Sequence, residues 1–190
     1  MSICSTHYQY RALPPDTIRV LCLLPDEDTD APIRCRLVNH PLPRTARRCY
    51  YDALSYVWGD LAKPQKIAVD AQYLLVTDNL HKAIYHLRDR YIERFVWIDA
   101  VCINQDDTRE QEAQIRMMWR IYSLANRVIV WLGVAADQSD LAIEHICLTG
   151  TGKARRLLEN DNKQPICSLL QRPWFRRIWV SSRNVLCASR

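Results

Sequence analysis

The sequence predicts an α/β protein in which helices flank a mostly parallel sheet. The stretch from Phe95 to Gly133 has the pattern of a buried strand, a polar turn, an amphipathic helix and a second buried strand. That order makes one βαβ unit of about the minimal size for parallel pairing. The stretch from Tyr50 to Gly59 is aromatic and β-prone and ends at a glycine, which is typical of another central strand.

The strand expected over Phe95 to Ile103 is apolar apart from Asp99, and such a run is typical of a strand covered on both faces. A buried acid is costly unless it is paired. Asp99 is therefore either a structural acid bonded to neighbouring amides or a functional acid at the strand end. Asp107 and Glu110 then form a capping-box-like helix start, so polar residues gather where a strand meets a helix.

The helix expected from Glu110 to about Ala125 carries an apolar stripe with helical spacing. Its members are Ile115, Met118, Trp119 and Tyr122, widened by Met117, Ile121 and Ala125. This stripe predicts a helix packed deep in the core, with Met118 on the buried face. The run from Val128 to Leu132 then predicts another buried strand.

The remaining elements are shorter. Residues 1–17 predict an extended arm, and Ile18 to Leu23 with Ile33 to Val38 predict an N-terminal β-hairpin. The stretch from Lys66 to Thr77 turns at Asp70-Ala71, which predicts an inserted hairpin lying over the sheet. A helix starting at Thr77 or Asp78 keeps its spacing to Tyr91. Further on, Leu141 to Leu148 predicts a short helix, and 154–160 another helical turn.

Composition limits the function classes. The chain has 190 residues, of which 48% are hydrophobic and 25% charged, as expected for one globular domain. The net charge of +5 comes from dispersed arginines, which favours solvated side chains over a nucleic-acid surface. The eight cysteines form no CxxC pair, so no metal site is expected and the cysteines are interpreted as small buried groups. No apolar run approaches the ~20 residues of a membrane span, and a cytoplasmic location is expected.

Four blocks carry a resemblance to a known family, and they are YDALSYVWGD, WIDAVCINQDD, EQEAQIRMMWRIYSLANRVIVWLG and RPWFRRIWV. In this order and spacing they resemble the fungal heterokaryon incompatibility (HET) domain over residues 18–180, with 1–17 as an arm and 181–190 as a divergent tail. The resemblance implies an intracellular domain that triggers cell death when non-self is recognised. It also implies protein partners or self-assembly, and a flavodoxin/TIR-like fold, because the family is a distant relative of TIR domains.

The C-terminal block departs from the family pattern. Family members usually continue as W-x-x-Q-E, whereas here Ser182-Arg183 stand at the Gln-Glu positions after Trp179. Some TIR domains cleave NAD with a glutamate after such a segment, so Arg183 marks a lost candidate acid. The alternative function, a TIR-like NAD-cleaving enzyme, is expected to be inactive in this chain, and NAD is expected only as a substrate of that alternative. A degenerate copy, truncated at its C-terminus, stays open.

One candidate site follows from the expected sheet. The carboxyl ends of parallel strands share an edge where ligands bind in α/β proteins. The polar and aromatic residues expected there, as one pocket, are Ser55, Tyr56, Trp58, Asp60, Asp99, Asn104, Gln105 and Asp107. Asn104, Gln105 and Asp107 have a simpler interpretation as loop and cap residues, and Glu110 is interpreted as a capping partner. No catalytic residue is assigned. Trp131, Trp174 and Trp179 are interpreted as core, or as an aromatic wall for a nucleotide base.

Overall fold

The computed structural model describes residues 6–45, 47–150 and 164–176. They fall into two compact units, one ending at Trp131 and the other beginning at Leu132. The first unit contains the sheet. None of the helices that the structure describes is long and apolar enough to cross a membrane.

The described residues form one seven-stranded sheet with the order β5-β4-β2-β1-β6-β3-β7. The strands are β1 (Thr17–Leu23), β2 (Arg34–Pro41), β3 (Asp52–Ser55), β4 (Gln65–Val69), β5 (Gln72–Val76), β6 (Arg94–Trp97) and β7 (Val128–Val130). The pairs β2–β4, β3–β6 and β3–β7 are parallel, whereas β1–β2, β1–β6 and β4–β5 are antiparallel. The sheet is therefore mixed, and the prediction of a mostly parallel sheet is wrong.

The three strands predicted as neighbours do lie together, but β7 is at the edge of the sheet and its Val130 is 40% exposed, so the prediction of a buried strand there is wrong. β3 is flanked by β6 and β7, and both pair with it in parallel. Trp97 on β6 and Val130 on β7 consequently belong to one sheet, as predicted, with β3 between them. The helix that links β6 to β7 is α3 (Thr108–Leu124), so the predicted strand-helix-strand order is confirmed. β6 and β7 run in the same direction, but β3 lies between them and they do not pair with each other.

The strand predicted over Phe95 to Ile103 is too long. β6 ends at Trp97, and Asp99–Cys102 forms the short helix α2. Asp99 Oδ1 accepts the Ala100 N–H at 2.7 Å, and an acid is favourable in the first turn of a helix. Val101, Cys102 and Ile103 are buried all the same. A short apolar run fits a buried helical turn as well as a buried strand, which explains the error.

Both predicted hairpins are present. β1 pairs with β2 along the full length of β1, from Thr17↔Pro41 to Leu23↔Cys35. β4 and β5 form the inserted hairpin, turning at Asp70, whose φ is +53°. This hairpin does not lie over the sheet as predicted. It extends the sheet sideways, because β4 pairs in parallel with β2.

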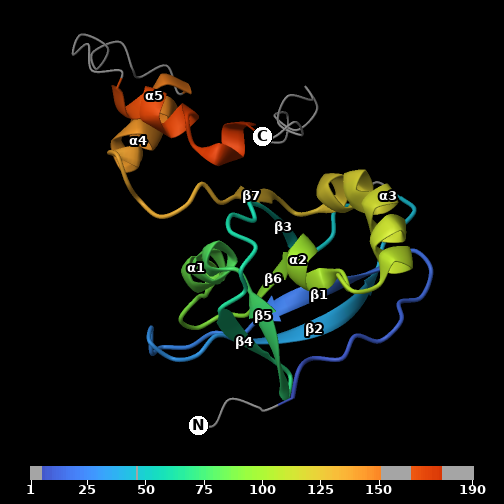
Figure 1. The fold of residues 1–190 in the computed structure, drawn as a ribbon. Coiled ribbons are helices and arrows are strands. Elements are labelled where there is room, and N and C mark those ends of the chain that lie inside the picture. The colour runs from blue at the N-terminus through green and yellow to red at the C-terminus, as the bar shows by residue number, and fades with distance from the viewer. Residues whose placement is uncertain (1–5, 46, 151–163, 177–190) are drawn as a thin grey trace. The chain divides into compact units, whose positions relative to one another are not determined.

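The helix α1 (Asp78–Leu87) begins where the sequence predicts. Thr77 is its N-cap, and its hydroxyl accepts the Leu80 N–H at 3.3 Å. The helix ends before Tyr91, because Arg88 adopts an extended conformation with φ −63° and ψ 128°. Arg88 then bonds to backbone carbonyls of the β1–β2 connection, including Ala31 at 2.7 Å. Figure 1 shows α1, α2 and α3 beside the strands of this sheet.

The predicted stripe on α3 is confirmed for Met117, Met118, Ile121, Tyr122 and Ala125 and is wrong for Ile115 and Trp119. Gln114, Ile121 and Leu124 are buried, and Met117, Met118 and Tyr122 are partly buried against the core. Ile115 is 56% exposed and Trp119 is 71% exposed. The inward face is thus rotated by one residue, because Gln114 turns toward the sheet and donates its amide to the Thr17 carbonyl at 3.0 Å.

The core of the first unit combines aliphatic, aromatic and cysteine side chains. Its largest fully buried members include Trp97, Tyr51, Tyr56 and Ile121. Cys22, Cys35, Cys49 and Cys102 are buried with free thiols, as predicted for most of the cysteines, whereas Cys147 and Cys167 in the second unit are exposed.

The elements that the structure describes in the second unit are helices. They are α4 (Ser139–Gly150), α5 (Gln164–Leu170) and the 3₁₀ helix η2 (Pro173–Arg176). The predicted helix from Leu141 to Leu148 is confirmed within α4, and α5 was not predicted. Trp174 is buried, as its interpretation as core requires. The predicted turn at 154–160, Trp179, the tail 181–190 and Arg183 lie outside the described residues.

Burial of His40 makes the fold sensitive to acid. Its ring on β2 packs edge-on against Tyr50 and Tyr51, with centroids at 4.8 and 5.6 Å, and its Nε2 is buried without a hydrogen-bond partner among the described residues. Burial lowers the pKa of His40. The unfolded chain then binds a proton that the folded chain resists. The stability that His40 contributes is fully present above the unfolded pKa of about 6.5 and is lost as the pH falls from there through the lower folded pKa.

We therefore expect His40→Phe, which keeps an aromatic ring but cannot be protonated, to flatten the dependence of Tm on pH between about 7.5 and 5. Burial also lowers the pKa of His81, so part of the dependence should remain. Thermal unfolding followed by circular dichroism at stepped pH measures both curves. Equal slopes for the wild type and His40→Phe would contradict the expectation.

Candidate functional site

The candidate site lies at the carboxyl edge of the three parallel strands. Because β3, β6 and β7 run in the same direction, the segments that follow them emerge at one edge of the sheet. Trp58 follows β3, Asp99 follows β6 and Trp131 follows β7. All three are partly buried. We call this region the polar edge and define it by these residues together with Asn79 and Gln105.

The two polar clusters predicted from the sequence meet at one hydrogen bond. The Trp58 indole Nε1 donates to Asp99 Oδ2 at 3.1 Å. The Asp99 carboxylate also accepts the N–H of Ala100, so it makes the hydrogen bonds expected of a structural acid. The bond ties the exit of β3 to the start of α2.

Gln105 belongs to the same edge but bonds to backbone. Its Nε2 donates to the Asp99 carbonyl at 3.0 Å and to the Ile103 carbonyl at 3.3 Å. Gln111 of α3 in turn donates its amide to the Gln105 carbonyl at 2.7 Å and to Gln105 Oε1 at 3.1 Å. This chain of amides holds α2, the following loop and α3 in a fixed relation.

Asn104 and Asp107 shape the start of α3. Asp107 is the N-cap, and its Oδ1 accepts the N–H groups of Arg109 at 3.0 Å and Glu110 at 3.1 Å. Asn104 Oδ1 accepts the Asp106 N–H at 3.2 Å. In a standard capping box Glu110 would accept the N–H of the N-cap residue Asp107. Here its Oε1 accepts the Asn104 N–H instead, at 2.8 Å. The cap interpretation of these residues is thus confirmed, with the reciprocal bond displaced.

The other predicted residues follow β3 closely. Ser55 ends the strand, and its carbonyl accepts the Trp131 N–H at 2.9 Å. Tyr56 is only 2% exposed and belongs to the core. Asp60 is exposed, and its carboxylate accepts the Ala62 N–H at 3.0 Å within its own loop. A shared pocket for all eight predicted residues stays a prediction.

Asn79, which the sequence does not single out, links the segment after β7 to the segment after β3. From the first turn of α1 its Nδ2 donates to the Val57 carbonyl at 2.6 Å, while its Oδ1 accepts the Trp131 indole N–H at 2.9 Å. The Trp131 ring also lies 5.2 Å from the His86 ring at an interplanar angle of 34°. An asparagine after a helix cap gives no sequence signal for such a bridge, because its partners lie 22 and 52 positions away.

We expect Asn79→Ala to lower the free energy of unfolding by about 1–3 kcal/mol, because a partly buried carbonyl and an indole N–H each lose their partner. Denaturant titration followed by tryptophan fluorescence measures the change. The control is Asn39→Ala, at an exposed position on β2. Equal stability of the two variants would show that the bridge contributes nothing.

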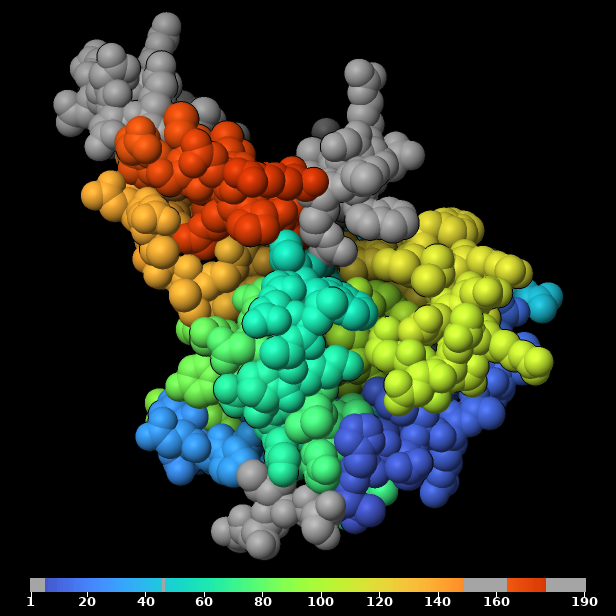
Figure 2. All heavy atoms as spheres, in the orientation of Figure 1, coloured from blue at the N-terminus to red at the C-terminus, as the bar shows by residue number. Residues whose placement is uncertain are grey.

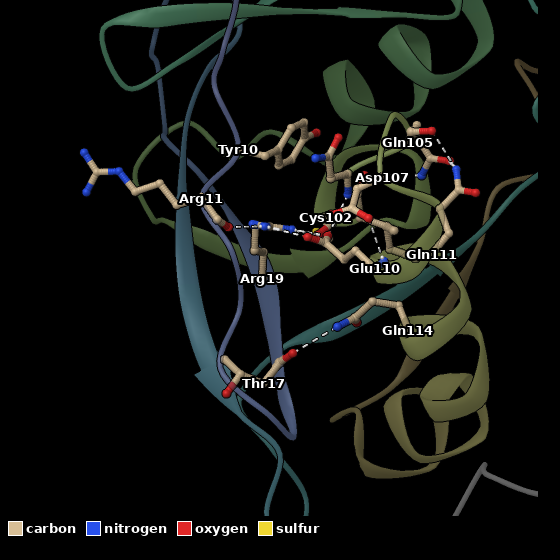
Figure 3. Close-up of polar contacts among 12 residues, drawn as sticks. Tyr10, Arg11, Thr17, Arg19, Cys102, Gln105, Asp107, Glu110, Gln111 and Gln114 are labelled. Atoms are coloured by element: carbon tan, nitrogen blue, oxygen red, sulfur yellow. Dashed lines mark hydrogen bonds and ion pairs between the residues drawn. The ribbon is translucent and has the colours of Figure 1, made fainter.

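A second polar cluster lies beside the start of α3 (Figure 3). Arg19 of β1 is 2% exposed and binds Glu110 with both terminal nitrogens, one of them at 3.0 Å from Oε2. Arg19 also donates to the carbonyls of Cys102 at 3.1 Å and of Arg11. Its guanidinium lies 4.8 Å from the centre of the Tyr10 ring. Sequence reasoning missed this pair, although a lone charge inside the apolar run TIRVLCL is a signal for a buried partner.

The hydroxyl of Tyr10 donates to the Val101 carbonyl at 2.8 Å, and burial raises the pKa of Tyr10. The phenol thus stays protonated and keeps its donor role. In the part of the chain that the structure describes, His, Cys, Asp and Glu side chains do not gather in groups of three that could hold a metal ion. The chemistry of both clusters is that of hydrogen bonds and ion pairs between segments of the chain.

Two comparisons with known proteins find relatives. Residues 51–182 match the family described as heterokaryon incompatibility protein (HET). Among curated proteins, the chain is 29% identical over 224 aligned residues to "Heterokaryon incompatibility protein 6, OR allele" of Neurospora crassa, covering 92% of this chain and 32% of that protein. The chain thus spans about a third of the length of that relative.

No solved structure matches the chain. The flavodoxin/TIR-like part of the predicted fold is therefore without structural support, and neither match supports a TIR-like NAD-cleaving activity. The matched residues begin next to β3 and extend past η2. Since they make up well over half of the sequence, the chain belongs to the heterokaryon incompatibility (HET) family.

Proposed function

We propose that this chain acts in fungal non-self recognition, as a heterokaryon incompatibility domain that triggers the incompatibility response leading to cell death. The observation that carries the proposal is the family match over residues 51–182. The likeness to an incompatibility protein of Neurospora crassa, over nearly the whole chain, supports it.

The geometry adds a physical reason. The blocks that resemble the family are far apart in the sequence, yet Trp58 of the first bonds to Asp99 of the second at 3.1 Å. Gln111 and Trp131 of the third block bond to Gln105 and to Ser55. The first three family blocks are therefore joined around the polar edge. A surface built by these three blocks is the place where a function common to such a fold would reside.

The proposed mode of action is contact with protein partners or with further copies, in the cytoplasm, without a cofactor, membrane or nucleic acid. Side chains of the polar edge bond mainly to one another and to backbone groups. Such an edge is preorganised for docking, because little conformational entropy is lost when a partner binds to groups already held in place.

Inducible expression of the chain in a filamentous fungus tests the proposal. We expect arrested growth and loss of viability, with cellular NAD unchanged. Trp58→Phe keeps the aromatic ring but removes the N–H that binds Asp99, so it should weaken the response while the protein still accumulates. Leu61→Ala, at a position 68% exposed in the next loop, is the control and should act as the wild type.

Normal growth at confirmed expression of the wild-type chain would contradict the proposal. A fall in NAD that accompanies growth arrest would replace docking with an enzymatic activity. A full response from Trp58→Phe would show that the bond to Asp99 is not needed.

A further inference from the structure

The N-terminal arm, residues 6–13, covers the free edge of β5. β5 is the outermost strand on its side of the sheet. Its Tyr73 N–H donates to the Thr6 carbonyl at 3.0 Å, and the Tyr8 N–H donates to the Tyr73 carbonyl at 2.8 Å. The His7 ring packs edge-on against Tyr73 at 5.5 Å. In the space-filling view the arm, in dark blue, lies on the surface beside the green atoms of this hairpin (Figure 2).

The arm also completes the buried ion pair. Arg19 donates to the carbonyl of Arg11, and its guanidinium packs on the ring of Tyr10, whose hydroxyl reaches the Val101 carbonyl (Figure 3). A buried guanidinium needs all its donors satisfied. The body of the domain therefore requires an arm in this place, but the contacts do not require that the arm belong to the same chain.

The hinge between arm and body is the place where another path would begin. The chain turns into β1 at Pro14, Pro15 and Asp16, and Asp16 has a φ of +54°. A positive φ is uncommon for a residue with a Cβ, although aspartate adopts it more readily than most. Each proline favours an extended conformation for the residue before it. An extended hinge would relieve the positive φ and carry the arm away from its own β5.

We propose that the arm exchanges between two copies of this chain. Residues 6–13 of each copy lie along β5 of the other and complete the other's Arg19–Glu110 pair, which gives a closed two-fold dimer. Exchange of an identical element forms a dimer at low cost, because the exchanged arm makes the same contacts as the closed arm. The inference goes beyond the proposed function and does not depend on it.

A disulfide between arm and body distinguishes the two states. His7 and Tyr73 are β-bridge partners, and paired strands bring Cα atoms within the 4.4–6.8 Å, roughly, that a disulfide needs. His7→Cys and Tyr73→Cys are combined in a chain whose Cys4, Cys147, Cys167 and Cys187 are serine. The protein is refolded at about 5 μM and at about 500 μM, a range over which mass action favours dimers, and then oxidised.

We expect the link to be intramolecular at the low concentration. At the high concentration a covalent dimer should appear on a non-reducing gel. Mixing ¹⁵N-labelled and unlabelled copies before refolding lets mass spectrometry show that position 7 of one copy is joined to position 73 of the other. The single-cysteine variants are the controls. Exclusively intramolecular links at both concentrations would overturn the proposal.

Two substitutions at Asp16 in the hinge test the proposal independently. Asp16→Gly and Asp16→Val both remove the carboxylate that binds Arg120 at 3.0 Å, so they differ mainly in their tolerance of a positive φ. Glycine accepts that conformation and a β-branched residue does not. We expect the ratio of dimer to monomer, measured by size exclusion with light scattering, to be at least about tenfold higher for Asp16→Val. Equal ratios would overturn the role of the hinge.

Discussion

Replacing Glu110 by glutamine is expected to lower the free energy of unfolding by about 3–5 kcal/mol, because it leaves the charge of Arg19 buried without a counter-ion. Arg19 is 2% exposed, and the Glu110 side chain is 10% exposed. The two groups therefore interact away from water, where an unpaired charge is most costly. Urea unfolding followed by circular dichroism measures the loss.

Glu112→Gln is the matched control on the same helix. The Glu112 side chain is 64% exposed and lies 3.7 Å from Arg116. Loss of such a surface pair should change stability by less than about 0.5 kcal/mol. The double variant Arg19→Met, Glu110→Leu should recover much of the stability lost in Glu110→Gln, because no charge is then left buried. A Glu110→Gln variant as stable as Glu112→Gln would show that the buried pair is energetically neutral.

The importance of this pair could not be derived from the sequence. Arg19 stands out within TIRVLCL, which indicates that its charge must meet a partner, but nothing local identifies that partner. Glu110 lies 91 positions away at the start of a helix, where a capping role explains it equally well. A pair of this kind depends on how β1 is placed in the sheet, and that placement is set by tertiary packing.

The central strands could be predicted because each is a short apolar run bounded by turn residues. Strand direction was harder. β1 enters between β2 and β6 and is antiparallel to both, whereas the strand-helix-strand pattern of residues 95–133 suggests parallel pairing throughout. The inserted hairpin was found from its turn at Asp70. Its place at the sheet edge depends on pairing with β2, which no local signal encodes.

Part of the polar edge could also be predicted. Trp58 and Asp99 are expected at one edge because the predicted strands that carry them are parallel neighbours, and they bond directly. Asn79 was missed because it comes from the side, on α1. Asp60 was included because of its sequence position, yet its carboxylate bonds within its own loop. Rules about strand ends locate an edge of the sheet, but they do not determine which side chains turn toward it.

The face of α3 is the clearest case in which periodicity misleads, and it gives the second large effect. The predicted stripe was broad, and its two sides differ in the structure: Ile121 is 0% exposed, whereas Ile115 is 56% exposed and Trp119 is 71% exposed. Two apolar stripes overlap on this helix. The contacts of Gln114 with Thr17 and of Tyr51 with the Ile121 carbonyl at 2.8 Å select the inner one.

Ile121→Asp should therefore unfold the first unit or lower its stability by more than about 4 kcal/mol, because it places an unpaired carboxylate in a closed core. Trp119→Asp, which adds the same charge two residues earlier on the outer face, should cost less than about 1 kcal/mol. Thermal unfolding by circular dichroism and the dispersion of amide signals in NMR spectra compare the two. If Trp119→Asp unfolds the protein while Ile121→Asp melts as the wild type does, the side of the helix that carries Trp119 is the buried face.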